Sequence, residues 1–249
     1  SMWMWLGENA GGGRVEFVAD AFYSPDWDEN NRMSTLESLV SRLNKDADID
    51  AVLAFGTWSG KACATDDITW PVFVWSVSND IEAGIIRSAD DSGRDNLFAA
   101  VEVGRYRHQV RLFHNFFGFT RLGIAYENTP TGMGSIALVE IENAAADLGL
   151  ELLRCTDQFD IPDLMLASER LLACHESLVK QGAQAVYVTY SKGMVRENIP
   201  ALLAPFAKAG IPSFSQLGSS EVRNGVLLGM SQASLLDEGR FSAEAMDAV

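Results

Sequence analysis

The stretch that decides the fold is Val52-Leu53-Ala54-Phe55-Gly56-Thr57-Trp58-Ser59, an apolar run that ends in small hydroxylated residues. A helix-like stretch follows. A second apolar run, Pro71 to Ser76, then leads into the polar loop Val77-Ser78-Asn79-Asp80. Short apolar runs without alternation are typical of strands buried on both faces, as in parallel sheets whose strands are joined by helices. The sequence therefore predicts a parallel unit with polar groups at its strand ends.

The same arrangement recurs far downstream. Val186-Tyr187-Val188-Thr189-Tyr190-Ser191 precedes another helix-like stretch, which is followed by a short run, Ile211 to Ser215, and the polar loop Gln216-Leu217-Gly218-Ser219-Ser220-Glu221. Ligands of open parallel sheets bind at the carboxyl ends of the strands. Two similar units with polar strand ends predict two related lobes that face one cleft.

Strands alternate with helices along the whole chain, which predicts an α/β fold of two lobes, each a parallel sheet flanked by helices. The expected strands are residues 14–19, 51–55, 71–76, 97–101, 121–126, 151–155, 185–190, 212–215 and 226–229. The expected helices are residues 31–44, 60–66, 106–117, 131–148, 162–181, 198–209 and 234–249.

The lobe changes are expected near residues 102–121 and 219–223. Residues 1–104 and 222–249 would then form the first lobe, and residues 105–221 the second. No strand precedes the opening Trp3-Met4-Trp5-Leu6-Gly7, which is typical of a helix tail. We therefore expect the first strand of that lobe, and some native sequence at one or both ends, to be missing.

Charge and composition exclude several classes of function. The formal net charge of the 249 residues is −15, which argues against binding to a nucleic-acid backbone, because that requires clustered Lys and Arg. No apolar run approaches the roughly 18 residues that a membrane helix needs, and no signal peptide is visible in the sequence.

The cysteines and histidines predict no metal site. They show neither a Cys-x-x-Cys pair nor a zinc-like spacing. Cys63 and Cys155 have the character of small buried residues. Cys155 and Cys174 could form a disulfide only if the fold brings them together.

Two catalytic interpretations fail on spacing. Gly56-Thr57-Trp58-Ser59-Gly60 has the order Gly-x-x-Ser-Gly rather than the Gly-x-Ser-x-Gly of a nucleophile elbow, and no histidine follows a strand end where it could act as base. Gly132-Met133-Gly134-Ser135-Ile136-Ala137 matches a dinucleotide motif. However, five residues that include a proline separate it from its strand, whereas such a site needs a tight turn. We expect no catalytic residue and no cofactor.

The remaining interpretation is a binding site for a small solute. Helix N-termini after the strand ends would bind a carboxylate, and Asp80, Glu127 or Glu221 would hold an ammonium group. Aromatic walls would come from Trp58, Tyr126 and Tyr190. Such a site suits a free amino acid. The alternative for each residue is structural: a helix N-cap, a solvated carboxylate or a ring in the core.

Several of these segments resemble those of a known family. They are Phe55-Gly56-Thr57, Pro71 to Asp80, Leu122 to Asn128, Ala146 to Glu151, Gly210 to Phe214, and Ser135 near a helix start. The sequence resembles the substrate-binding proteins of ABC transporters with the type I periplasmic-binding fold, in particular the tryptophan- or tyrosine-uptake group. The resemblance covers most of the chain, from about Gly13 onward. The usual Asn-Pro after the Tyr126 strand is replaced by Glu127-Asn128-Thr129-Pro130.

The resemblance implies a ligand closed between two lobes and delivery to an ABC permease in the membrane. It also implies a monomer in the periplasm or another extracytoplasmic space, with a lipid anchor as one option. The contacts that it implies are Thr57, Trp58, Ser59, Ser78, Asn79, Asp80, Asn128, Ser135, Tyr190, Ser191, Leu217, Gly218 and Ser219. Two alternatives remain open: a sensing module of a signalling system, and a nucleotide-dependent enzyme that uses Gly132 and Gly134.

Overall fold

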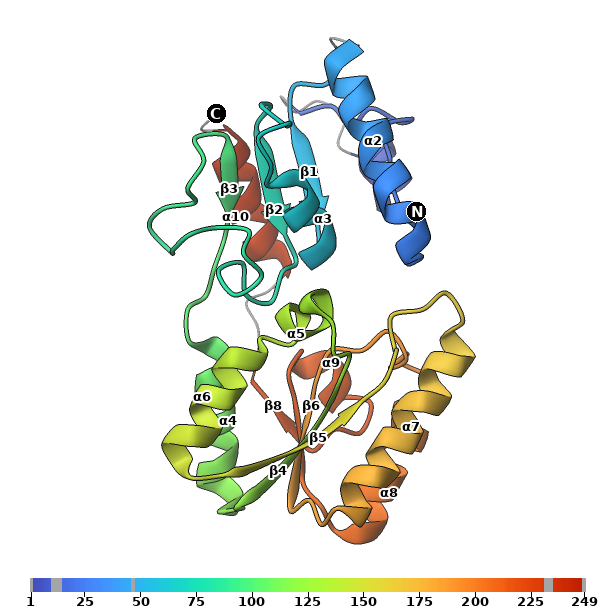
Figure 1. Cartoon of the computed structure of the whole chain (residues 1–249), viewed down its shortest axis with the longest axis vertical. Helices are drawn as coiled ribbons and strands as arrows, with labels where there is room; N and C mark the ends of the chain where they lie inside the picture. The colour runs from blue at the N-terminus through green and yellow to red at the C-terminus, as the bar shows by residue number, and fades with distance from the viewer. Residues whose placement is uncertain (1, 10–14, 46–47, 231–234, 248–249) are drawn as a thin grey trace.

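The computed structural model describes residues 2–9, 15–45, 48–230 and 235–247. These residues build two separate parallel sheets rather than one continuous sheet (Figure 1). One is three-stranded with the order β1-β2-β3, and the other is five-stranded with the order β5-β4-β6-β7-β8. We call the parts built around these sheets the first lobe and the second lobe. The α/β class with helix-flanked parallel sheets is confirmed.

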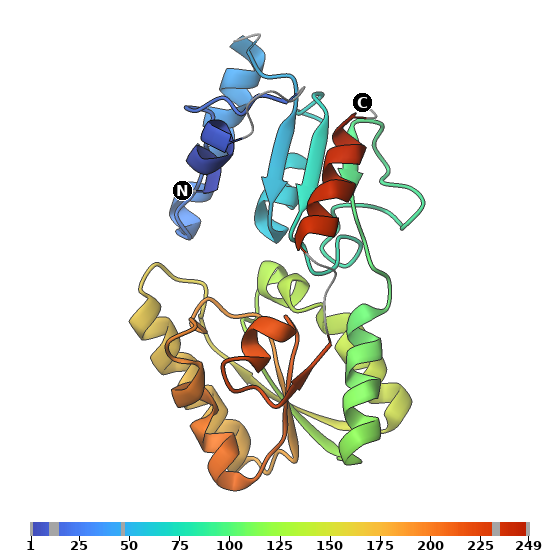
Figure 2. The ribbon, with the colours of Figure 1, turned by 180° about the vertical axis from the view of Figure 1, so that it is seen from behind.

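The first lobe packs helices against its three short strands. Its elements are α1 (Met2–Asn9), α2 (Glu29–Lys45), β1 (Val52–Phe55), α3 (Thr57–Cys63), β2 (Val72–Trp75), β3 (Leu97–Ala99) and α10 (Leu235–Asp247). Helix α3 lies very close to β2 at Gly60, where a Cβ atom would sit 2.6 Å from a methyl group of Val74. On β3, the Phe98 ring lies 6.0 Å from that of Phe241 in α10. The first and last described helices, α1 and α10, therefore both belong to this lobe (Figure 2).

The second lobe is a three-layer sandwich (Figure 1). Its strands are β4 (Arg121–Tyr126), β5 (Glu151–Thr156), β6 (Ala185–Val188), β7 (Ser213–Ser215) and β8 (Leu228–Gly229). Its helices are α4 (Arg105–Phe117), α5 (Pro130–Ser135), α6 (Leu138–Leu148), α7 (Leu164–Lys180), α8 (Ile199–Ala209) and α9 (Ser219–Val222). Helices α4 and α6 pack on one face of the sheet and α7 and α8 on the other, with one apolar core per face. Burial on both faces explains why these strands are apolar runs.

Three expectations about the elements need correction. Residues 15–19 form no strand, and Arg14 lies outside the described residues. Phe17 packs against Trp3 of α1, with ring centroids 5.3 Å apart, instead of joining a sheet. The single helix expected over residues 131–148 is two helices, α5 and α6, because Ala137 adopts a left-handed conformation (φ 52°).

The third correction concerns the return to the first lobe. Strand β8 pairs with β7, through Phe214 with Leu228 and Ser215 with Gly229. The second sheet therefore extends past residue 222, where the first lobe was expected to resume. The rest of the predicted division into lobes stays a prediction.

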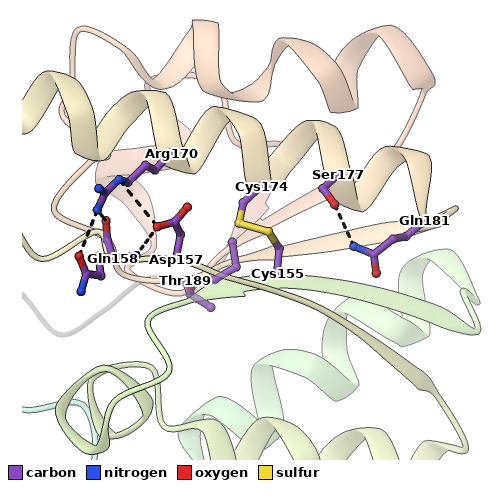
Figure 3. Close-up of a disulfide and its surroundings, with 9 residues drawn as sticks. Cys155, Asp157, Gln158, Arg170, Cys174, Ser177, Gln181 and Thr189 are labelled. Atoms are coloured by element: carbon purple, nitrogen blue, oxygen red, sulfur yellow. Dashed lines mark hydrogen bonds and ion pairs between the residues drawn. A yellow bond between two sulfur atoms is a disulfide. The ribbon is translucent and has the colours of Figure 1, made fainter.

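A disulfide joins the edge strand β5 to helix α7 (Figure 3). Cys155 and Cys174 are 19 residues apart in sequence, and their pairing was left open by the sequence. Cys155 is therefore not a free thiol, whereas Cys63 is free and buried as expected. Disulfides persist in oxidising compartments and are rare in reducing ones.

We predict that this disulfide stabilises the second lobe by about 3 kcal/mol, because it restricts a loop of this length in the unfolded chain. Reduction with dithiothreitol should lower the melting temperature by about 6–12 °C, as followed by circular dichroism. A Cys155→Ala/Cys174→Ala variant is the matched control, since its lower melting temperature should not respond to the reductant. Equal melting of the wild type with and without reductant would contradict the prediction.

Candidate functional site

The break between α5 and α6 joins the two lobes. In a continuous helix, the N–H of Val139 would donate to the carbonyl of Ser135, four residues earlier. The break frees both groups, and both bind the first lobe instead. Ser78 Oγ donates to the Ser135 carbonyl at 2.5 Å, and the Val139 N–H donates to Glu82 Oε1 at 2.8 Å.

Residues after β1 and after β4 meet at the same place. Ser135 Oγ lies 3.3 Å from Thr57 Oγ1, although 78 residues separate them in sequence. A Cβ atom on Gly134 would lie only 3.6 Å from Thr57 and from Ala83. Thr57 is 8% exposed. The structure thus brings Thr57, Ser78 and Ser135 together, as the two-lobe interpretation requires.

Gln216 connects this contact to the next strand end. Its side chain is fully buried. Its Nε2 donates to the Ser135 carbonyl at 3.4 Å, and its Oε1 accepts from the Tyr190 N–H at 2.7 Å. Gln216 therefore positions Tyr190 relative to Ser135. Sequence reasoning did not select it as a site residue, although a glutamine directly after a buried strand was a usable signal.

Glu140 is a second residue that sequence reasoning missed. Its Oε2 accepts from the N–H groups of Tyr106 and Arg107 at 2.9 and 3.2 Å, at the start of α4. Its Oε1 accepts from Asn79 Nδ2 of the first lobe at 2.7 Å. Helix α4 has no side-chain cap at its own N-cap residue, Gly104, so Glu140 supplies one. The predicted contact Asn79 is thus bonded to the second lobe.

Two of the three carboxylates expected to hold an ammonium group already have partners. Glu127 Oε2 accepts from the N–H groups of Phe159 and Asp160 at 3.2 and 2.9 Å. Glu221 accepts from the hydroxyl of Ser215 and is 5% exposed. Burial raises the pKa of Glu221 to about 7, although the Ser215 hydrogen bond opposes the shift. Both side chains support the local structure of the second lobe.

Asp80 differs from the other two. It is 2% exposed, and its Oδ1 has no hydrogen-bond partner among the described residues. Burial raises its pKa to about 7. A buried carboxylate without a partner is costly to the folded chain. Of the three expected carboxylates, Asp80 is the one with a buried oxygen that has no hydrogen-bond partner among the described residues.

The other predicted residues fall into two groups. Some hydroxyls serve their own backbone: Ser59 Oγ donates to the carbonyls of Phe55 and Gly56, and Ser191 Oγ accepts from the Gly193 N–H. Other residues are exposed or half-buried at the strand ends, namely Trp58, Asn128, Tyr190, Leu217 and Ser219. Gly218 is buried, and its N–H donates to Ser215 Oγ at 2.6 Å.

Tyr126, expected as an aromatic wall, is 6% exposed and packs in the core between the sheet and helices α4 and α6. Its position at the end of a strand buried on both faces explains this. The core position is the alternative that the sequence left open. Trp58 and Tyr190 remain as the candidate walls.

The catalytic alternatives gain no support from the geometry. The hydroxyl of Ser59 donates to backbone carbonyls of its own segment. The ring of His175 lies in the core of the second lobe, with Nδ1 2.8 Å from the Leu202 carbonyl. A Cβ atom on Gly132 would lie 2.3 Å from the Glu127 carbonyl, so a tight turn accounts for this glycine. Within the described ranges, no group of His, Cys, Asp and Glu could hold a metal ion. No described helix has the length and apolarity to cross a membrane.

A surface hollow of about 750 Å³ lies along α2, away from the strand ends. Its lining is polar and includes Ser34, Ser38 and Arg42. Arg42 is bound there by Asp20 and Asp48. These ion pairs account for three of the charged groups in the hollow, and we assign the hollow no role.

No family model matches this sequence, and no curated protein does. Solved structures do match. A conserved domain protein from Vibrio cholerae aligns with a TM-score of 0.62 at 16% identity, over 84% of this chain and 64% of that protein. The ABC domain from Streptococcus pneumoniae in complex with L-Trp aligns with a TM-score of 0.57 at 13% identity, over 89% and 69%. The fold is that of the type I periplasmic binding proteins.

A third protein with this periplasmic-binding fold is an ABC-transporter solute-binding protein from R. palustris in complex with benzoate. It aligns with a TM-score of 0.54 at 16% identity, over 90% of this chain and 59% of that protein. This chain therefore spans about three fifths to two thirds of the length of these proteins. Two of these three structures hold a small ligand, L-Trp in one and benzoate in the other. At this identity the likeness establishes the fold, and the solute has to be argued from the site.

We predict that Glu140→Ala lowers the free energy of unfolding by about 2–3 kcal/mol, because two backbone N–H groups and Asn79 lose a charged acceptor. Urea titration would measure the loss. Glu142→Ala is the control: Glu142 forms an exposed ion pair with Arg154 at 3.0 Å, and its removal should change stability by less than about 0.5 kcal/mol. Similar small effects for both variants would refute the role given to Glu140.

Asp80→Asn should stabilise the protein at pH 8 and not at pH 4. The folded chain holds the Asp80 proton up to a pKa of about 7, whereas the unfolded chain releases it near pH 4. The folded state binds one more proton than the unfolded state over this range, so the free energy of unfolding of the wild type falls as the pH rises from about 4 to about 7. Asparagine removes that loss, which amounts to about 4 kcal/mol at pH 8. Urea unfolding at both pH values tests this, with the exposed Asp90→Asn as a control that should show no pH-dependent gain.

Proposed function

We propose that this chain is an extracytoplasmic solute-binding protein of an ABC importer. It binds a small solute between its two lobes, performs no catalysis and delivers the solute to a membrane permease. The observation that carries the proposal is the meeting of the strand ends of two parallel sheets, where Ser78 of the first lobe donates to the Ser135 carbonyl of the second at 2.5 Å. Ligands of such sheets bind at these ends.

The solute proposed is an amino acid, with aromatic ones as the leading candidates. Trp58 on the first lobe and Tyr190 on the second supply flat apolar walls, and each retains exposed surface. Aromatic rings at small-molecule sites bury large areas of ligand. The proteins of this fold from Streptococcus pneumoniae and R. palustris hold L-Trp and benzoate, which supports a planar carboxylate ligand for this chain.

Asp80 is proposed as the group that receives the ammonium of the solute. It is the buried carboxylate of the expected set with an unpartnered oxygen, and a cation beside it would favour its charged form. The carboxylate of the solute would face Thr57, Ser78 and the N-terminus of α3. This division of roles matches an amino acid, which carries both charges on one carbon.

The location proposed is outside the cytoplasm. The disulfide between Cys155 and Cys174 supports it, because such bonds persist where thiols are not kept reduced. The fold supports a permease as the partner, since the structural neighbours include solute-binding proteins of ABC transporters. We propose a monomer.

Thermal-shift measurements with the twenty amino acids, benzoate and 4-hydroxybenzoate test the function. A solute at 100 times its Kd should stabilise the protein by about 2.7 kcal/mol and raise the melting temperature by about 5–10 °C. No shift with any of these compounds would overturn the proposed solute class.

For the compound with the largest shift, calorimetry should show that Trp58→Ala and Tyr190→Ala each raise Kd by about tenfold or more. Phe116→Ala is the matched control. Phe116 is 66% exposed near the C-terminal end of α4, and its removal should leave Kd unchanged. If the control weakens binding as much as the two site variants, the placement of the solute is wrong.

A further inference from the structure

The lobes also touch at a second place, on the side away from the connection between β3 and α4. There the N-terminal end of α2 faces the loop between β5 and α7 (Figure 1). Trp27 and Arg32 come from the first lobe, and Asp160 and Lys192 from the second. We call these four residues the outer seam, to distinguish them from the contacts around Ser135.

Arg32 lies between Trp58 and Asp160 and forms a hydrogen bond with neither. Its guanidinium carbon lies 5.7 Å from the centroid of the Trp58 ring. Its Nη2 lies 4.0 Å from Asp160 Oδ2, and its side chain is only 22% exposed. The other carboxylate nearby is that of Glu29, whose Oε1 lies 3.8 Å from Arg32 Nη1. In the described part of the chain the guanidinium therefore has two acidic neighbours but makes no hydrogen bond. A half-buried arginine without hydrogen bonds leaves strong donors unused.

Asp160 shows the matching deficit on the other lobe. Its Oδ1 is buried and has no hydrogen-bond partner within the described ranges. Burial and the nearby charge of Glu127 both raise its pKa, whereas Lys192 and Arg32 act in the opposite direction. The other carboxylate oxygen, Oδ2, is the one that lies 4.0 Å from Arg32 Nη2, so a closer approach of Arg32 would give this carboxylate a charged donor.

Lys192 adds a parallel contact. Its Nζ lies 4.5 Å from the centroid of the Trp27 ring, a distance typical of cation–π attraction. The outer seam thus has two cross-lobe pairs in which each lobe supplies one cation. Each pair links a segment that precedes the first sheet to a loop at a strand end of the second.

We propose that the outer seam is a latch that favours the closed arrangement of the lobes, with Arg32 as a positioning residue. An approach of about 1 Å turns the Arg32–Asp160 pair into a direct charge-assisted hydrogen bond. The same arginine stays against Trp58, so closure and the placement of this aromatic wall are coupled. The naming of Trp58 as a wall rests on the proposed function, whereas the latch itself does not.

Small-angle X-ray scattering of the solute-free protein tests the latch. Arg32→Glu and Asp160→Arg should each raise the radius of gyration by about 1 Å, because like charges then face each other across the lobes. The combined variant restores an attractive pair and should return to the wild-type value. Raising NaCl from low to high concentration should expand the wild type, since the Debye length falls from about 10 Å at 0.1 M to about 3 Å at 1 M.

Arg154→Glu is the matched control. Arg154 pairs with Glu142 within the second lobe, so its reversal should leave the radius of gyration and its salt response unchanged. Lys192→Met should expand the protein and Lys192→Arg should not, because arginine keeps the cation over Trp27. If either single reversal fails to fold, the salt titration and the Lys192 variants decide.

An unchanged radius of gyration in these variants, or a combined variant as expanded as the single ones, would overturn the latch. These experiments use no solute. Their failure would therefore leave the proposed solute binding intact, and an absence of thermal shifts with solutes would leave the latch intact.

Discussion

The structure depends on one broken turn of helix. At Ile136 and Ala137 the chain leaves the α-helical path, and the Ser135 carbonyl and the Val139 N–H lose each other as partners. A buried backbone group without a partner is costly. This applies to the Ser135 carbonyl, whose bond to Ser78 is partly buried, whereas the Val139 N–H lies at the exposed surface. The first lobe provides partners for both, through the Ser78 hydroxyl and the Glu82 carboxylate. Two backbone groups freed by the break in the helix thus help to join two separate sheets.

The polar residues around this junction divide into those that hold the structure and those that remain available. Glu140 and Gln216 use their oxygens on backbone N–H groups and position the start of α4 and the Tyr190 strand end. Asp80 and Asp160 each keep one buried oxygen without a partner among the described residues. Such groups lower stability and persist where a ligand or a moving element can satisfy them. A partner for Asp80 would contribute to the free energy of solute binding, and a partner for Asp160 would contribute to that of lobe closure.

Prediction from the sequence succeeded where local patterns were strong. Strand β4 matched its expected bounds, and α2, α4, α7 and α8 matched within two residues at each end. These segments are long and periodic, or they are strands buried on both faces. It failed for residues 15–19, where apolar residues pack on α1, and for the helix over 131–148, whose break at Ala137 has no local signal such as glycine or proline at that position. Ser78 and Asn79 follow a strand that was predicted, but their partners 57 or more residues away were not foreseeable.

By itself the sequence determined that this chain forms parallel sheets with helices between the strands. It also determined which strand ends carry polar groups, because apolar runs and the residues that follow them are local properties. Only the tertiary structure decided which of those polar groups have hydrogen-bond partners and which do not. Burial, charge and hydrogen-bond partners depend on residues distant in the chain, so Glu127, Glu221 and Asp80 have the same local character and different states. The same reason applies to Arg32 and Asp160, which share no pattern in sequence and face each other only because two lobes fold beside one another.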